Sequence, residues 1–264
     1  MKTLKKYVST AATVAMCAST MVASSAHAKD IHVLATGALS AAFKKLGPAF
    51  EKKTGDHLVI SWGPSYGTSP DALPIRIKNN EPMDVCFMIG AALDDQIVKG
   101  RFDGNTRADL AESRIGLAVR AGLPVPDISS VDKLRKALLN AKSVAFSEGA
   151  SGTFITGTLF SKLDVVEQMN SKSVLIKGKE LVGTAIDRGE ADLGLQQISE
   201  LRAIPTIQFA GPLPIEVQKV SVISAAIATD AKEKAAAQTL ISYLKTPEAK
   251  AIFESTGLDP IGSK

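Results

Sequence analysis

Ile31-His32-Val33-Leu34-Ala35-Thr36-Gly37-Ala38-Leu39-Ser40 joins a strand to a helix within one short stretch. Residues 31–35 form an apolar β-run. After Gly37, apolar residues recur every three or four positions up to Phe50, which is typical of a helix with one buried face. A strand that passes directly into a helix is the repeating unit of parallel α/β sheets. Ligands of such sheets bind at the carboxyl ends of the strands, opposite helix N-termini, so this turn is also a candidate site.

The same alternation continues to the end of the chain. Apolar runs bounded by turn residues predict further strands, and segments of helical period lie between them. We therefore expect an α/β fold in which parallel sheets are covered by helices. The further predicted strands are 58–62, 85–89, 115–119, 142–146, 174–176, 192–196 and 217–227; the predicted helices are 71–79, 93–99, 130–140, one that follows 149–152, 179–188, 231–244 and 247–255.

Residues 1–28 have the three parts of a secretory signal peptide. Three lysines, the last of them Lys6, precede an apolar run over residues 8–22, and Ala26-His27-Ala28 provides small residues at a cleavage site. The alternative is an N-terminal membrane anchor, but the run is short and is interrupted by Ser and Thr. We expect the mature chain to begin near Lys29, to be periplasmic and to have no membrane anchor.

The charges and residue types that remain after position 28 argue against several functions. The leader holds three of the 31 basic residues, so 28 basic residues face 27 acidic ones, and nucleic-acid binding is not indicated. Cys86 becomes the only cysteine, and its apolar neighbours favour core packing over a reactive thiol. His32 and His57 lack the spacing of a metal site. We expect no metal, no cofactor and a monomer.

Four segments of the chain carry a resemblance to a known family. They are residues 35–40, the Pro82-Met83-Asp84-Val85 step, Gly194-Leu195, and the tail 240–249, which reads Leu-Ile-Ser-Tyr-Leu-Lys-Thr-Pro-Glu-Ala. With them, nearly the whole mature chain resembles the periplasmic molybdate-binding proteins of ABC importers. The resemblance implies the two-lobed type II periplasmic binding protein fold, in which each lobe has its own sheet and two strands cross between the lobes. On this chain it implies lobe 1 at 29–114 and 221–264, lobe 2 at 115–220, and crossing strands near 115–119 and 217–223.

The ligand-binding positions of that family are altered in this chain. The family holds its oxyanion with neutral donors, and the positions of its first Ser and of its Tyr correspond here to Ala38 and Gln197. The second loop, residues 63–69, is longer and adds Tyr, Thr and Ser side chains, and the backbone turn reads Ala150-Ser151-Gly152. We therefore expect molybdate to bind weakly and a larger polar anion, a di- or tricarboxylate, to bind better.

Several residues have two interpretations as ligands for such an anion. Arg114 can clamp a carboxylate at two points from the strand between the lobes, or it can pair on the surface with Glu112. The Ser151-Gly152 turn is either a plain helix cap or an anion nest, and one residue of the pair 196–197 is expected to face the cleft. We predict that the ligand is bound by Gly37, Ala38, Ser40, Ser65, Tyr66, Gly67, Thr68, Ser69, Arg114, Ser151, Gly152, Thr153, Gln196 and Gln197.

Two functions from different classes fit these residues. A solute-binding protein would close on an oxyanion or organic acid and deliver it to an ABC permease. An enzyme would use the same cleft. The resemblance extends to periplasmic aconitate isomerases, whose tricarboxylate substrate suits the altered ligand-binding positions. We favour interconversion of cis- and trans-aconitate by an allylic proton shift, which needs one group to remove a proton and one to return it. The candidates are Tyr66, Glu148 and Glu200; as alternatives, Tyr66 would fix its loop and the two glutamates would be solvated loop charges.

Overall fold

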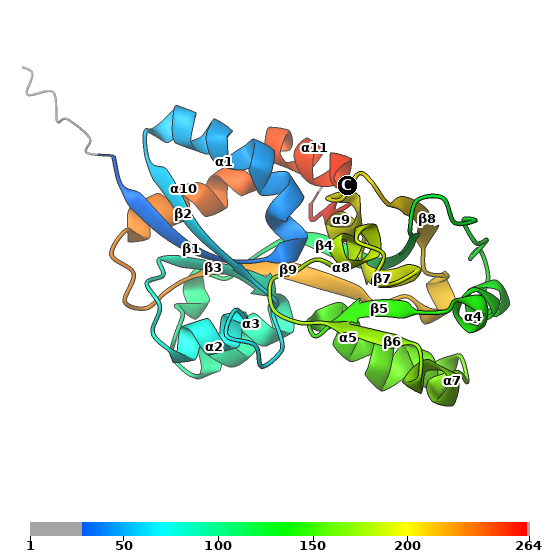
Figure 1. The fold of residues 1–264 in the computed structure, drawn as a ribbon. Coiled ribbons are helices and arrows are strands. Elements are labelled where there is room, and N and C mark those ends of the chain that lie inside the picture. Colours follow the sequence, from blue (N-terminus) through cyan, green and yellow to red (C-terminus); the bar gives the residue numbers. More distant parts are fainter. Residues whose placement is uncertain (1–27, 263–264) are drawn as a thin grey trace, which may run out of the picture.

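The computed structural model of the chain describes residues 28–262 and shows a two-lobed α/β molecule (Figure 1). The predicted signal peptide, residues 1–28, lies outside the described residues except for Ala28. The strands are β1 Asp30–Thr36, β2 His57–Gly63, β3 Val85–Ile89, β4 Ala108–Val119, β5 Val144–Ser147, β6 Ser173–Ile176, β7 Leu193–Gln197, β8 Gln208–Pro212, β9 Val220–Ile227 and β10 Asp259–Pro260. The helices are α1 Ser40–Thr54, α2 Leu73–Lys78, α3 Gly90–Val98, α4 Val131–Asn140, α5 Ala150–Phe154, α6 Phe160–Lys162, α7 Val166–Asn170, α8 Val182–Asp187, α9 Ile198–Arg202, α10 Lys234–Leu244 and α11 Pro247–Ser255.

One curled sheet runs through both lobes. Its strand order is β2-β1-β3-β9-β4-β7-β5-β6, and β8 and β10 also pair with β4. Strand β1 is parallel to β2 and β3, and β5 is parallel to β6 and β7. The first half of β4 pairs with β9, and the second half pairs with β7 and β8, all antiparallel. The hydrogen-bonded sheet is thus continuous through β4, where we expected separate sheets.

The buried apolar residues form separate cores on the two sides of β4. The first core takes side chains from β1–β3, α1, the start of β4, β9, α10 and α11, with Phe50, Phe87 and Phe253 among its largest members. The other two clusters consist of residues between Ile115 and Val217. The long strand β4 is thus shared by the cores on its two sides and connects the lobes, which also touch where α9 lies against α1.

The chain returns to the first core through a short 3-10 helix that leads into β9. Ile215–Val217 is a 3-10 helix, and β9 begins only at Val220, so the predicted crossing strand near 217–223 starts later than expected. Gln218 fastens this return to β4. Its Oε1 accepts the backbone N–H of Ile115 at 2.9 Å, and its Nε2 donates to the carbonyl of Ile115 at 2.9 Å.

Local signals explain the elements that position the cleft. A 3-10 turn at Gly37–Leu39 leads β1 into α1, and Gly55, at a φ of 81°, ends that helix in the left-handed conformation that glycine adopts easily. Ser130 caps α4, because its Oγ accepts the N–H of Lys133 at 3.3 Å. Cys86 is buried in β3, and burial raises the pKa of its thiol, so it is a core residue as predicted.

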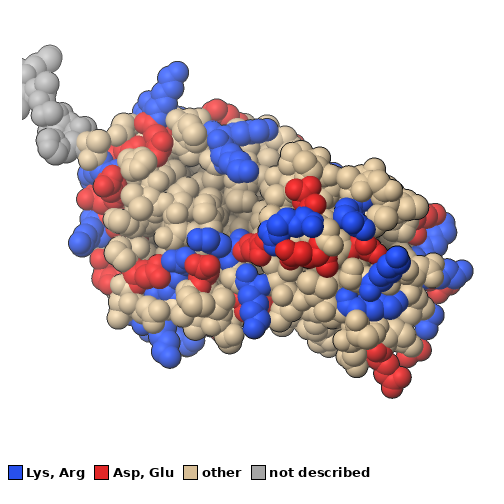
Figure 2. All heavy atoms as spheres, in the orientation of Figure 1, with Lys and Arg blue, Asp and Glu red and all other residues tan. Residues whose placement is uncertain are grey.

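The surface carries charges of both signs. On the face shown in Figure 2, Lys and Arg side chains lie among Asp and Glu side chains. This mixture agrees with the near balance of basic and acidic residues beyond position 28. Across residues 28–262, no helix combines the length and the apolar character needed to span a bilayer.

Candidate functional site

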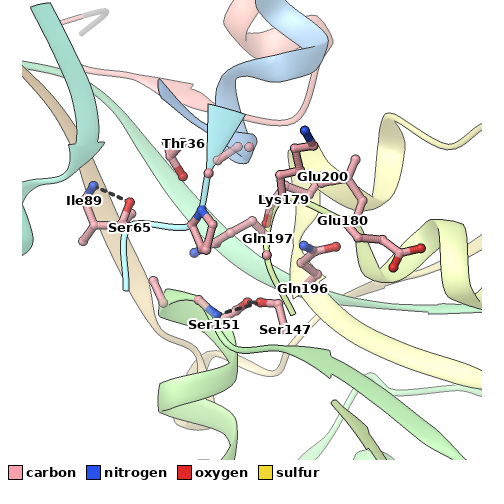
Figure 3. Close-up of a pocket in the computed structure, with 18 residues that line it drawn as sticks. Thr36, Ser65, Ile89, Ser147, Ser151, Lys179, Glu180, Gln196, Gln197 and Glu200 are labelled. Carbon is pink, nitrogen blue, oxygen red and sulfur yellow. Dashed lines mark hydrogen bonds between the residues drawn. The ribbon is translucent and has the colours of Figure 1, made fainter. Parts of the chain in front are cut away.

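A partly open cavity lies between the lobes, where β1, β2, β5, β6 and β7 end (Figure 3). The space not filled by protein atoms, including solvent at the opening, is ≈ 460 Å³. The cavity is narrow, because the centre of a water molecule fits into only ≈ 30 Å³ of it. A ligand larger than a few water molecules therefore needs the lobes to move apart on entry. The lining residues are Thr36, Gly37, Ala38, Gly63, Pro64, Ser65, Ile89, Ser147, Gly149, Ala150, Ser151, Gly178, Lys179, Glu180, Leu181, Gln196, Gln197 and Glu200.

Helix N-termini surround this cavity. Strand β1 passes through Thr36 and Gly37 into α1, and β5 passes through Gly149 into α5. The first N–H groups of a helix have no acceptor within it, and the helix dipole makes this end partly positive. The arrangement therefore favours an anion and meets it with neutral donors from both lobes.

Side-chain hydroxyls and amides add further donors. Ser65 Oγ accepts a backbone N–H of β3 at 3.0 Å, so its hydroxyl proton remains for another acceptor. Gln197 Oε1 accepts the hydroxyl of Ser113 at 3.0 Å, and its buried Nε2 has no partner among the described residues. Gln196 Oε1 accepts the N–H of Val182 at 2.8 Å. An acceptor atom on a ligand would satisfy Nε2 of Gln197, because a buried donor without a partner costs free energy.

Glu200 is a buried acid in the wall of this cavity. It lies in the first turn of α9, directly after β7. Burial raises the pKa of its carboxyl to about 8, against the smaller opposite effect of a backbone hydrogen bond from Gln197. A Cβ on Gly37 would lie 2.6 Å from Oε1 of Glu200, so glycine leaves room for the carboxyl. A carboxyl with this pKa can accept and return a proton near neutral pH.

Glu148 follows β5 and lies at the mouth of the cleft, outside the cavity lining. Its Oε1 accepts the N–H of Gly178 at 2.8 Å, and its Oε2 accepts the N–H of Thr68, from the other lobe, at 3.4 Å. Burial by itself raises the pKa of this carboxyl, but the Ser69 hydroxyl and three backbone N–H groups outweigh burial and hold the pKa below its usual value. The Ser69 hydroxyl faces the carboxylate without completing a hydrogen bond. The structure therefore does not place Glu148 where a proton carrier must be.

Arg114 also lies away from the cavity. Its guanidinium pairs with Asp259 of β10 at 2.7 Å and faces Glu112 at 3.7 Å, in a groove beside α11. The preceding residue, Ser113, faces Gln197, and successive side chains of a strand point to opposite faces. The predicted position beside the cleft is therefore wrong, and Arg114 makes the surface pair that was the alternative.

Tyr66 lies beside the cavity and not in it. Its ring packs against the first core and lines a neighbouring groove with Phe154. Burial, with a smaller effect of Asp95, raises the pKa of its phenol. The structure brings these predicted residues together around the cavity: Gly37, Ala38, Ser65, Ser151, Gln196, Gln197 and Glu200. It places these outside the lining: Ser40, Tyr66, Gly67, Thr68, Ser69, Arg114, Glu148, Gly152 and Thr153.

Sequence reasoning missed four polar residues of the lining, Thr36, Ser147, Lys179 and Glu180. Thr36 ends β1, Ser147 ends β5, and Lys179 follows β6. Lys179 was assigned to a helix at 179–188, but α8 begins only at Val182. The rule that ligands bind at the carboxyl ends of strands, applied to every strand in turn, would have found all four, because Glu180 follows β6 as Lys179 does.

Comparison with known proteins gives the same fold and two kinds of relative. The family model for bacterial extracellular solute-binding proteins matches residues 31–259. An aconitate isomerase from Pseudomonas sp. is 38% identical over 246 residues, 93% of this chain and 94% of that protein. The molybdate-binding protein ModA of Azotobacter vinelandii is 24% identical over 242 residues, 90% of this chain and 92% of that protein.

Solved structures agree on the fold. The periplasmic molybdate-binding protein of Azotobacter vinelandii superposes with a TM-score of 0.69 at 22% identity, over 86% of this chain and 98% of that one. The sulfate-binding protein SubI of Mycobacterium tuberculosis superposes with a TM-score of 0.70 at 16% identity, over 89% and 88%. At these identities the likeness shows the two-lobed architecture.

Proposed function

This chain belongs to the family of bacterial extracellular solute-binding proteins, and we propose that it is a periplasmic isomerase that interconverts cis- and trans-aconitate in the cleft between its lobes. The observation that carries the proposal is Glu200, a buried acid with a pKa of about 8 in the wall of an anion-binding cavity. The 38% identity with an aconitate isomerase supports the choice of substrate. Residues 1–28 would direct export of the chain.

The proposed reaction moves one proton and one double bond. Ionised Glu200 takes a proton from the methylene carbon, and the electron pair of that C–H bond forms a new double bond to the central carbon. The electrons of the old double bond then take up a proton at the former vinyl carbon. Protonated Glu200 returns that proton, so its carboxylate is restored and no co-reactant is consumed. The conformation in which the cleft holds the arm with the methylene group decides whether the product is cis or trans.

The surrounding donors would stabilise the intermediate. Negative charge in the allyl intermediate spreads into the carboxylates that flank it. The N–H groups at the starts of α1 and α5 can donate to those oxygens, as can the Gln197 amide and the Ser65 hydroxyl. Because the fold holds these donors in place, they need no reorganisation as the charge develops.

The alternative is a solute-binding protein that delivers an oxyanion or organic acid to an ABC permease. The family match and the molybdate-binding relative favour it. A protein that only binds an anion, however, has no need of a group that exchanges a proton near neutral pH, and the pKa of about 8 gives Glu200 that capacity. We therefore prefer the isomerase.

Incubation of the purified mature chain with cis-aconitate tests the proposal, with the trans isomer followed by proton NMR. We expect the wild type to bring the two isomers to equilibrium. Calorimetry with tricarballylate, an unreactive tricarboxylate, reports binding separately. If the wild type binds tricarballylate and leaves cis-aconitate unchanged, the isomerase proposal fails and the solute-binding alternative stands. Nanomolar molybdate affinity without any heat from carboxylates would overturn the ligand class as well.

A further inference from the structure

We propose that Lys179 selects the ligand of this cleft by pairing with the carboxylate that a tricarboxylate has and a dicarboxylate lacks, and that Glu148 holds Lys179 in position. The inference rests on the proposed function for its substrate class and names the residue that selects it. Among the described residues that line the cavity, Lys179 is the only Lys or Arg.

The ammonium of Lys179 is available to a ligand. Within residues 28–262 it forms no ion pair, whereas the neighbouring Glu180 is occupied by Arg188 at 2.6 Å. In Figure 3, Lys179 lies on the same side of the cavity as Glu180 and Glu200, away from the hydroxyl of Ser151. Lys179 is exposed, so its side chain must turn inward to bring its one positive charge to a ligand seated on the neutral donors of the cavity.

The rest of the lining leaves this positive charge uncompensated. Glu180 is neutralised by Arg188, and Glu200 is mostly protonated at neutral pH because burial raises its pKa to about 8. The other donors are hydroxyl, amide and backbone N–H groups, which accept any anion oxygen. The single ammonium of Lys179 therefore favours a ligand that places a carboxylate beside it over a ligand that lacks this carboxylate.

Glu148 fixes the turn that presents Lys179. Gly178, directly before Lys179, donates its N–H to Oε1 of Glu148 at 2.8 Å and has a φ of 68°. From the opposite lobe, Thr68 donates its N–H to Oε2 at 3.4 Å, and a Cβ on Gly67 would lie 2.8 Å from Cδ of Glu148. The carboxylate of Glu148 thus contacts both the first lobe, at Thr68, and the turn that precedes Lys179. We assign Glu148 as a positioning residue, because it lies outside the cavity lining.

The test compares two unreactive ligands that differ by one carboxylate, tricarballylate and glutarate. Their dissociation constants are measured by calorimetry at pH 7 for the wild type, Lys179→Gln and a matched control, Lys177→Gln. Lys177 is an exposed lysine of the same turn that does not line the cavity. We expect Lys179→Gln to reduce the preference for tricarballylate over glutarate about tenfold, the usual effect of one charge-assisted hydrogen bond, and Lys177→Gln to leave it within twofold.

An unchanged preference in Lys179→Gln, or an equal loss in Lys177→Gln, would overturn the inference. Because neither ligand reacts, the result does not depend on turnover. A wild type that prefers tricarballylate through Lys179 but does not isomerise cis-aconitate leaves this inference intact and removes only the proposed function. If the wild type isomerises cis-aconitate but Lys179→Gln keeps the preference for tricarballylate, the proposed function stands and the inference about Lys179 fails.

Glu148 is tested by a double-mutant cycle. We expect Glu148→Gln alone to reduce the preference for tricarballylate over glutarate. In the Lys179→Gln background the same substitution should change this preference by less than twofold, because the two residues act through one contact. A purely structural role of Glu148 would weaken both ligands equally in both backgrounds, and that outcome would contradict its assignment as a positioning residue.

Discussion

Glu200 in the wall of the cleft and Glu148 at its mouth are the same residue type in opposite environments. Glu200 is surrounded by protein with one backbone hydrogen bond, and burial raises its pKa to about 8. Glu148 is also partly buried, but the Ser69 hydroxyl and N–H groups from both lobes outweigh burial and hold its pKa below the usual value. Deep burial with few donors lets Glu200 move a proton, whereas donors aimed at a less buried carboxylate make Glu148 a fixed charge.

Replacement of the acid in the wall should have the largest effect. Glu200→Gln removes the proton carrier but keeps the volume of the side chain, so we expect kcat for cis-aconitate to fall about 10³-fold. The dissociation constant of tricarballylate should stay within about threefold of the wild-type value. Steady-state kinetics and calorimetry measure the two quantities, with Glu167→Gln on the exposed face of α7 as the control. A variant that keeps a tenth of wild-type activity would remove Glu200 from the mechanism.

The same substitution should stabilise the protein at high pH. The folded pKa of Glu200 is raised from 4.5 to about 8, so its carboxyl costs nothing below pH 4.5 and destabilises increasingly as pH rises towards 8. We expect Glu200→Gln to unfold with a free energy about 5 kcal/mol above the wild type at pH 8.5, because the rise of the pKa from 4.5 to about 8 costs about 1.4 kcal/mol per pKa unit, and to show almost no difference at pH 4.5. Urea unfolding at both values measures it, and a difference that does not depend on pH would contradict the burial argument.

Glu148, at the mouth of the cleft, should change stability with pH in the opposite direction to Glu200. The folded pKa of Glu148 lies below 4.5, so its hydrogen bonds stabilise the protein above pH 4.5, and this contribution is lost as pH falls through the folded pKa. Glu148→Gln should therefore be less stable than the wild type at pH 7, by less than the Glu200 effect, and the difference should shrink in acid. Urea unfolding between pH 3 and 7 checks this, and a difference that grows in acid would show that Glu148 is not held ionised.

Tyr66 should give the smallest effect. It lies outside the cavity lining, so Tyr66→Phe should change kcat and KM for cis-aconitate by less than about threefold. Loss of turnover by 10²-fold would mean that the lobes rearrange enough on ligand binding to bring the phenol to the substrate.

The sequence predicted the elements of the fold well where the periodicity was strong. The strand at 85–89 and the helix at 247–255 have the predicted bounds, because a continuous apolar run defines the first and Thr246 with Pro247 defines the start of the second. The crossing near 217–223 was misplaced because its apolar residues continue through a 3-10 helix. Periodicity alone does not distinguish that turn from the strand that follows it.

The candidate site was predicted at the level of loops and less well for single side chains. Residues that end strands β1 and β7, or follow them directly, are indeed in the cavity, because topology brings the carboxyl ends of these strands together. Arg114 was misassigned because the direction of a side chain on β4 depends on strand register, which Ser113 and Gln197 reveal only in the structure. The opposite roles of Glu148 and Glu200 depend on contacts between segments far apart in the sequence, which no local pattern encodes.

The pH dependence of kcat/KM for cis-aconitate tests the central claim most directly, because it reports the ionisation of the essential group in the free enzyme. If ionised Glu200 removes the proton, kcat/KM should rise tenfold per pH unit below its pKa and level off around pH 8, the pKa set by burial of Glu200. The residual activity of Glu200→Gln should lack this rise. A profile that is already flat from pH 5 upwards would show that an ordinary carboxylate, and not the buried Glu200, moves the proton.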